Sequence, residues 1–167
     1  LLARHPKQVI EPPYSPRSHT LRLYPCACRT IRTRVGEGFI EVRYPMELRY
    51  EAAEVQDAIR KGIEQAWRTE AQADLPQRTA RLAGQLGFRC GAVTVRNART
   101  RWGSCSARDD ISLSIHLMKL PDELIDYVII HELCHTIHKN HGPKFHKLLD
   151  RLTGGHHLEL RQRLKTY

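Results

Sequence analysis

Alternating hydrophobic and polar residues mark three short stretches in the first part of the chain. These stretches are 21–24, 31–35 and 39–44. A Gly-Glu-Gly turn at 36–38 joins the last two stretches, and Pro45 ends the run. Alternation with a period of two is typical of half-buried strands. The prolines of residues 1–18 favour an extended arm, so residues 1–50 are predicted to form this arm and a small β region.

Helical periodicity begins at Glu51 and continues to about Ala73. Apolar residues recur there at four-residue steps, at Val55, Ile59, Ile63 and Trp67. Such a stripe is typical of a helix that packs on a core. Pro76 predicts an interruption, because proline lacks the backbone N–H that a helix interior needs. A second helix is then predicted over 78–86, with Gly87 as its stop.

Strand patterns return after the second predicted helix. Residues 92–96 predict a short strand, and 99–106 with 111–117 predict a hairpin around the turn at 108–110. Apolar and polar residues alternate along 111–117, so one face of that strand is predicted to be buried. This mixture of strands and helices predicts an α+β fold.

The segment 125–141, IDYVIIHELCHTIHKNH, carries the residues best suited to chemistry. Its apolar pattern predicts a helix that the chain leaves near Asn140. His131 and His135 would leave one face of that helix a turn apart and could hold one divalent metal ion. Glu132 lies about 100° round the helix from His131, where a carboxylate can reach a metal-bound water without being a ligand.

The third metal ligand has three candidates. His138 is disfavoured, because its Cα would lie about 10.5 Å from that of His131 along the helix axis. His141 becomes available if the Asn-His-Gly-Pro segment at 140–143 ends the helix and turns the chain back. Glu159, from a following helix, is the alternative. We predict His141 as the third ligand.

Composition and charge limit the other possibilities. The chain has 27 Lys and Arg against 18 Asp and Glu, a formal net charge of +9. This charge predicts at most a weak nucleic-acid association, because the basic residues are spread out and no nucleic-acid-binding motif occurs. No long apolar run or secretory pattern is present, which predicts a soluble cytoplasmic protein that does not enter a membrane. The 5 cysteines form no CxxC pair and favour a reduced compartment over a disulfide framework.

Four motifs together resemble one known family. They are HELCH at 131–135, Asn140-His141, Ile125-Asp126-Tyr127-Val128 and Arg101-Trp102-Gly103-Ser104-Cys105. From about Arg29 to about Leu164 the chain resembles the YgjP-like family of predicted zinc metallopeptidases, relatives of the SprT-like and WLM proteins. The resemblance implies a zincin-like fold for residues 51–167, either as a separate domain or continuous with residues 1–50.

The same resemblance implies a function and a set of site residues. The expected zinc (Zn2+) ligands are His131, His135 and His141. Glu132 is expected to be the general base for hydrolysis of peptide or protein substrates by a metal-activated water. The residues themselves point to no single oxyanion stabiliser; His116, His138 and Tyr127 are candidates. The segment Arg101–Cys105 has no chemistry that we can derive, and His156 and His157 are predicted to be exposed.

Three positions depart from the usual pattern of the family. Ser114 stands where Asn is usual, Gly142 where Ser is common and His146 where Trp is common. None of them is an expected ligand. In zincins the strand before the metal helix often lies at the sheet edge, so 111–117 is expected to accept an extended peptide as an added strand.

Two other functions fit the same residues. The first is a metal-binding module with little turnover that recruits nucleic acid or protein through its basic surface. The second is a structural protein whose histidines are satisfied in a metal-free core. Metal analysis of a His131→Ala variant separates the structural protein from the other two, and the loss of hydrolysis in Glu132→Gln identifies the peptidase.

Overall fold

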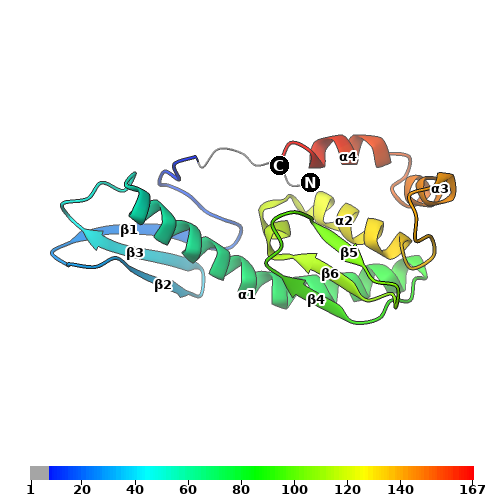
Figure 1. Ribbon diagram of the computed structural model, residues 1–167, viewed down its shortest axis with the longest axis horizontal. Helices are drawn as coiled ribbons and strands as arrows, with labels where there is room; N and C mark the ends of the chain where they lie inside the picture. Colours follow the sequence, from blue (N-terminus) through cyan, green and yellow to red (C-terminus); the bar gives the residue numbers. More distant parts are fainter. Residues whose placement is uncertain (1–7) are drawn as a thin grey trace. The chain divides into compact units, whose positions relative to one another are not determined.

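The computed structural model describes residues 8–167 and contains both helices and small sheets (Figure 1). The elements are β1 (Thr20–Cys26), β2 (Arg32–Gly36), β3 (Phe39–Pro45), α1 (Ala53–Leu86), β4 (Val93–Arg96), β5 (Gly103–Cys105), β6 (Ile111–Ser114), the 3₁₀ helix η1 (Ile115–Lys119), α2 (Asp122–Cys134), α3 (Pro143–Leu152) and α4 (His157–Leu164). The predicted α+β class is confirmed. Within residues 8–167, no helix is long and apolar enough to cross a membrane.

The described residues form two compact units, 8–69 and 70–167. We call them the N-terminal unit and the C-terminal unit. The sequence predicted a division near residue 50, whereas the two units divide inside α1, after Thr69. The first part of α1 belongs to the N-terminal unit because it packs on the strands of that unit, as the contacts of Gly62 show below.

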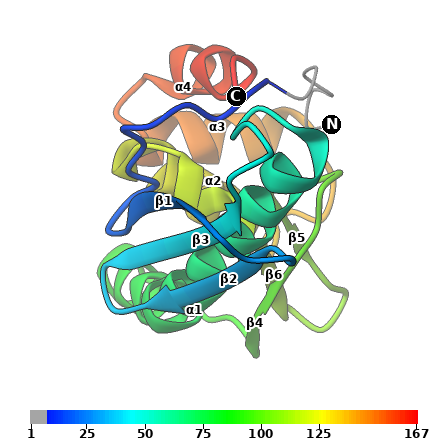
Figure 2. The same ribbon diagram turned by 90° about the vertical axis from the view of Figure 1, so that its left-hand side faces the viewer.

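Strand β3 is the middle strand of the N-terminal unit (Figure 2). It pairs in parallel with β1 and antiparallel with β2. Its Ile40 and Val42 are fully buried. A Cβ atom on Gly62 of α1 would lie 2.7 Å from Ile40 Cγ2, so glycine permits a close approach of helix and sheet.

Gln56 of α1 fixes the described part of the predicted arm. Its side chain is 2% exposed. The Gln56 amide donates to the carbonyls of Ile10 and Tyr50 and accepts a hydrogen bond from the Ile10 N–H at 2.8 Å. Residues 8–18 contain no helix or strand, in agreement with the prediction of an arm. The first seven residues of that prediction lie outside the described part of the chain.

Helix α1 is continuous, so the predicted interruption at Pro76 is wrong. A proline inside a helix costs about 3 kcal/mol, since one backbone hydrogen bond is lost and the ring crowds the preceding turn. Leu75 and Thr79, on either side of the proline, are both fully buried. The Thr79 hydroxyl also donates to the Leu75 carbonyl at 2.8 Å. Burial of these neighbouring side chains offsets the cost of the proline.

The sheet of the C-terminal unit has the order β4-β6-β5, with β6 in the middle. The expectation that 111–117 forms an edge strand is therefore wrong, since β4 pairs with one side of β6 and β5 with the other. The strand also ends at Ser114, whose hydroxyl accepts a hydrogen bond from the His116 N–H at 3.2 Å and caps η1. The edge strand beside α2 is β5, which comes from the Arg101–Cys105 motif.

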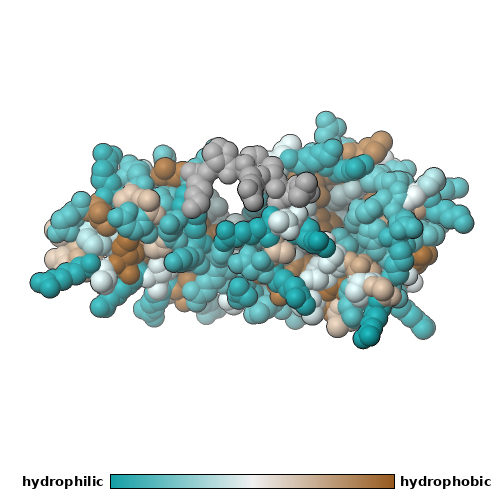
Figure 3. All heavy atoms as spheres, viewed as in Figure 1, coloured by the Kyte–Doolittle hydropathy of each residue, from teal (hydrophilic) through white to brown (hydrophobic). Residues whose placement is uncertain are grey.

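The face of the molecule drawn in Figure 3 is mostly hydrophilic, with scattered hydrophobic residues.

Cys26 and Cys28 form a disulfide across the turn after β1, with their Cα atoms 5.3 Å apart. The expectation of reduced cysteines does not hold for this pair, because the turn brings the two side chains together. Cys90, Cys105 and Cys134 are free thiols.

Candidate metal centre and adjoining cavity

The C-terminal end of helix α2 supplies the first two histidines of the candidate site, His131 in its last turn and His135 as its C-cap. Acidic residues occupy its first turn, where they favour the positive end of the helix dipole. The predicted continuation to about Asn140 is wrong, because the helix ends at Cys134. Thr136 explains this early end: its N–H donates to the Leu133 carbonyl and its hydroxyl donates to the same oxygen at 2.7 Å. Such tight bonds divert the last turn from the α-helical pattern.

Three imidazole rings converge after this turn. His131 Nε2 and His135 Nε2 each lie 3.1 Å from His141 Nε2. The candidate ligand atoms of the three residues all lie within 4.8 Å of one another. Tetrahedral ligands about 2.05 Å from zinc would be about 3.3 Å apart. The arrangement therefore fits one metal ion bound by the three Nε2 atoms.

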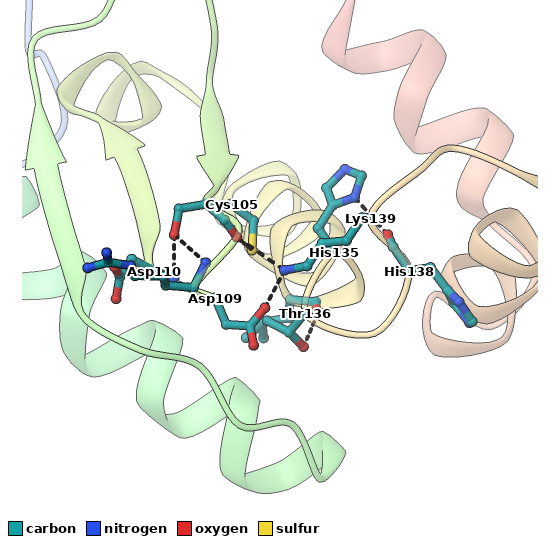
Figure 4. Close-up of polar contacts among 10 residues, drawn as sticks. Cys105, Asp109, Asp110, His135, Thr136, His138 and Lys139 are labelled. Atoms are coloured by element: carbon teal, nitrogen blue, oxygen red, sulfur yellow. Dashed lines mark hydrogen bonds and ion pairs between the residues drawn. The ribbon is translucent and has the colours of Figure 1, made fainter.

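The turn also fixes the ring of His135 (Figure 4). Its Nδ1 lies 2.9 Å from the His138 carbonyl oxygen. A carbonyl only accepts, so the hydrogen of His135 lies on Nδ1 and the Nε2 lone pair is available for a metal. His138 thus contributes its backbone to the site and not its ring.

Burial keeps His131 neutral. Desolvation, together with the neighbouring histidines, lowers the pKa of His131 to about 3. Burial also lowers the pKa of His141, and His135 lowers it further. A neutral imidazole is the form that binds a metal. Both rings are therefore ready to bind a cation at neutral pH.

Glu132 lies beside the three histidines and is 6% exposed. Burial raises the pKa of its carboxyl group to about 7, while the charge of Arg101 partly opposes the rise. Strand β5 packs directly against this carboxylate: a Cβ on Gly103 would lie 2.9 Å from Glu132 Cγ. Glycine at 103 therefore leaves the space in which the Glu132 side chain lies.

Two carboxylates of the C-terminal unit take other partners. Glu159, the alternative third ligand, lies in α4, where its Oε2 is 3.3 Å from His156 Nδ1. Asp126 accepts a hydrogen bond from Arg78 Nε at 2.5 Å. Neither carboxylate belongs to the histidine cluster among the described residues.

A cavity of about 470 Å³ adjoins the histidines and Glu132. Its wall includes a hydrogen-bonded chain of three side chains. The Tyr127 hydroxyl lies 3.1 Å from His157 Nδ1, and His157 Nε2 lies 3.2 Å from His146 Nδ1. Burial raises the pKa of Tyr127 to about 12, so the phenol is protonated at neutral pH. The two hydrogen bonds link α2, α3 and α4 at the wall of the cavity.

The sequence did not predict these hydrogen bonds, because His157 was expected to be exposed. His157 is instead only 4% exposed. The signal that could have found it is the spacing of His157, Leu160 and Leu164, which places all three on one helix face. The sequence also gave no role to Arg101–Cys105, whose residues border both the cavity and the histidine cluster.

Cys105 is not an activated nucleophile. Burial raises the pKa of its thiol, whereas a reactive cysteine needs a lowered pKa. Its sulfur contacts the Ser106 carbonyl at 3.5 Å. Covalent catalysis by this cysteine is therefore unsupported.

Comparison with models of known protein families shows the family of this chain. The model of the YgjP-like metallopeptidase domain matches residues 4–167. The chain belongs to the YgjP-like family. Its members are metallopeptidases, so the protein is a metal-dependent peptidase. No curated protein matches the chain significantly.

Two solved metallopeptidase zymogens are similar in structure. Jannalysin of Methanocaldococcus jannaschii is 23% identical, with a TM-score of 0.44 over 55% of this chain and 97% of its own. Abylysin of Pyrococcus abyssi is 22% identical, with a TM-score of 0.47 over 53% of this chain and 89% of its own. At these values neither likeness bears on substrate or mechanism.

Two of the departures from the YgjP-like pattern have structural roles here. Ser114 donates to the Ala98 carbonyl at 2.6 Å and caps η1. His146 completes the hydrogen-bonded chain from Tyr127. Each polar side chain therefore has a partner within the C-terminal unit, and that of His146 also borders the cavity.

Proposed function

We propose that this YgjP-like protein is a zinc-dependent metallopeptidase of zincin-like fold whose metal is held by His131, His135 and His141. The observation that carries this proposal is the convergence of their Nε2 atoms. Three imidazole ligands suit zinc, which keeps a fourth position open in catalytic sites. When bound, zinc supplies a Lewis acid that polarises the scissile carbonyl and makes water a nucleophile at neutral pH.

In this proposal Glu132 is the general base. Its carboxylate accepts a proton from the attacking water and passes it to the leaving amine. A pKa of about 7 suits this double role, because both protonation states are then populated near neutral pH. A bound divalent cation would favour the ionised form.

We propose that the peptide substrate binds along strand β5. Its residues Gly103, Ser104 and Cys105 line a pocket together with the three histidines and Glu132. One side of β5 pairs with β6. An extended peptide that pairs with the other side would lie along the histidine cluster. This assignment replaces the expectation for 111–117, whose strand β6 is paired on both sides.

The test combines hydrolysis with metal analysis. Zinc-loaded wild-type protein is expected to cleave members of a generic peptide library. Glu132→Gln is expected to bind the same amount of zinc and to be slower by about 10²- to 10⁴-fold. The control is Glu123→Gln, an exposed change in the same helix, where Glu123 pairs with Arg163. Hydrolysis by Glu132→Gln at the wild-type rate would refute the assigned base.

The nucleic-acid-binding alternative rests on the net charge of +9 and stays a prediction. Cytoplasmic location also stays a prediction. Retention on DNA that falls steeply with salt concentration would indicate a nucleic-acid partner without excluding peptidase activity.

A further inference from the structure

The cavity beside the histidines is rich in cations. Arg101, Arg161 and Lys165 all line it, and Glu132 is the only acidic residue among its described lining residues. Within residues 8–167, none of the three cations forms an ion pair or hydrogen bond with a carboxylate through its side chain. Three basic side chains therefore border one concave space that holds a single carboxylate, that of Glu132.

Some cations of the same unit are paired with carboxylates. Arg163, two residues from Arg161 on α4, lies 2.6 Å from Glu123. Arg78 pairs with Asp122 and Asp126. The lining of the cavity instead gathers three basic side chains and a single acidic one. Such an arrangement favours an anionic ligand.

The wall also carries a polar imidazole. His146 ends the hydrogen-bonded chain from Tyr127 and uses its Nδ1 in that chain. His146 lines the same cavity. The cavity volume of about 470 Å³ falls within the range of roughly 300 to 1,000 Å³ that is common for ligand pockets. It is large enough to take part of a peptide.

We propose that this cavity binds a carboxylate of the substrate, either an Asp or Glu side chain or the free C-terminus, through Arg161 and Lys165. The inference rests on the proposed peptidase function, because the cavity shares His131, Glu132 and His141 with the candidate site. A carboxylate accepts charge-assisted hydrogen bonds from arginine, often with both oxygens. The enzyme would therefore prefer acidic peptides, or peptides with a free carboxyl end.

Binding to zinc-loaded Glu132→Gln tests this preference without turnover. The probes are fluorescent peptides of one length: a neutral peptide with an amidated end, a series with a single Glu at successive positions, and the neutral peptide with a free carboxyl end. Fluorescence anisotropy gives their dissociation constants. At low salt we expect at least one acidic probe to bind about tenfold more tightly than the neutral amide. The Glu series and the free end distinguish the two sources of the carboxylate.

Variants of the basic residues test whether the preference for acidic probes depends on this cavity. In the Glu132→Gln background, Arg161→Gln with Lys165→Gln should remove the preference, and both changes are at exposed positions. The matched control, Arg163→Gln, removes one charge from the same helix outside the cavity and should retain the preference. Arg161→Glu should shift the preference to a probe with Lys in place of Glu.

Three outcomes overturn the proposal: equal dissociation constants for all probes, a preference that survives the double variant, and an oligonucleotide that binds through Arg161 and Lys165 more tightly than every acidic peptide. Because the readout is binding, absence of hydrolysis by the wild type would refute the proposed function and not this preference. Hydrolysis with equal binding of all probes would refute only the preference.

Discussion

The two sheets of this protein have the same strand arrangement but different chemistry. In each, the third strand in sequence is the middle one, parallel to the first and antiparallel to the second. The antiparallel edge strand of the N-terminal sheet is β2, and that of the C-terminal sheet is β5. Residues 32–34 of β2 are exposed, whereas all residues of β5 are half-buried against α2. Strand order alone therefore does not produce a candidate metal site.

The helix beside the edge strand makes the difference. Helix α2 brings His131 and Glu132 next to β5, and Gly103 allows the close contact. The edge strand of the other sheet also contains a glycine, Gly36, but a Cβ there would meet the ring of Phe39. The same residue type in equivalent strands thus leaves space for the Glu132 carboxylate in one sheet and for an aromatic ring in the other.

Loss of a metal ligand should have the largest effect. His135→Ala leaves two imidazoles, so we expect zinc content to fall from one equivalent towards zero and hydrolysis to fall by about a thousandfold or more. His138→Ala is the matched control, because only its backbone carbonyl contacts the site. Metal analysis and peptide hydrolysis measure both variants. Equal zinc loss in His138→Ala would show that its ring also binds the metal.

The two edge-strand glycines sharpen the comparison. In Gly103→Ala the new Cβ would lie 2.9 Å from Glu132 Cγ and 3.1 Å from Oε1, so the carboxylate must move. We expect hydrolysis to fall by about tenfold to a hundredfold, since small misplacements of a catalytic group are costly, while zinc content stays constant.

The matched change, Gly36→Ala, would place Cβ 2.4 Å from Phe39 Cζ. It should lower the stability of the N-terminal unit by about 1 kcal/mol through crowding and leave hydrolysis unchanged. Hydrogen exchange and peptide assays measure the pair. An activity loss in Gly36→Ala as large as in Gly103→Ala would contradict the difference between the two edge strands.

Helix α1 carries a buried polar side chain with several hydrogen bonds in each unit, Gln56 in the N-terminal unit and Arg78 in the C-terminal unit. Arg78, 8% exposed, hydrogen-bonds to Asp126 at 2.5 Å and to Asp122 at 3.0 Å. Arg78→Leu should destabilise the C-terminal unit by about 2 kcal/mol, because two partly exposed carboxylates lose a charged donor. Gln56→Leu should destabilise the N-terminal unit by about 1 kcal/mol, because the Ile10 N–H loses its acceptor.

Hydrogen exchange resolved by peptide measures Arg78→Leu and Gln56→Leu separately in each unit. We expect increased exchange in α2 for the first variant and around Ile10 for the second. Equal increases in both units from either variant would mean that the two units unfold together.

Exposed ion pairs should have the smallest effect. Lys139 pairs with Asp109 and donates to the Ser106 carbonyl at 3.1 Å (Figure 4). In the other sheet, Arg43 pairs with Glu41 at 2.8 Å. Lys139→Met and Arg43→Met should leave thermal stability nearly unchanged, because solvent screens such pairs. A large loss of stability in Lys139→Met alone would assign its pair a structural role in holding the turn.

Local patterns made much of the molecule predictable. The alternating stretches predicted the three N-terminal strands, because successive side chains of a strand point to opposite faces of the sheet. The i, i+4 spacing of His131 and His135 needs only helical geometry, and His141 follows after a short turn. The interruption at Pro76 was wrong because the penalty of a proline is local, whereas the burial of Leu75 and Thr79 depends on the packing around them.

The local pattern of hydrophobic and polar residues could not predict which distant segments pair with one another. Alternation shows that β6 is strand, but not that β4 and β5 occupy both of its sides. The Tyr127–His157–His146 chain joins helices α2, α3 and α4 through contacts that cross up to 30 residues of sequence. No periodicity of one segment carries that information.

The sequence by itself determined the histidine motif that can bind a metal, the position of Glu132 beside it and the α+β composition, because each follows from residue spacing within one element. Only the tertiary structure decided which strand borders the histidines, which side chains line the cavity and which cations there lack partners. These properties depend on distances between segments remote in the chain, and such distances are fixed only when the segments pack together.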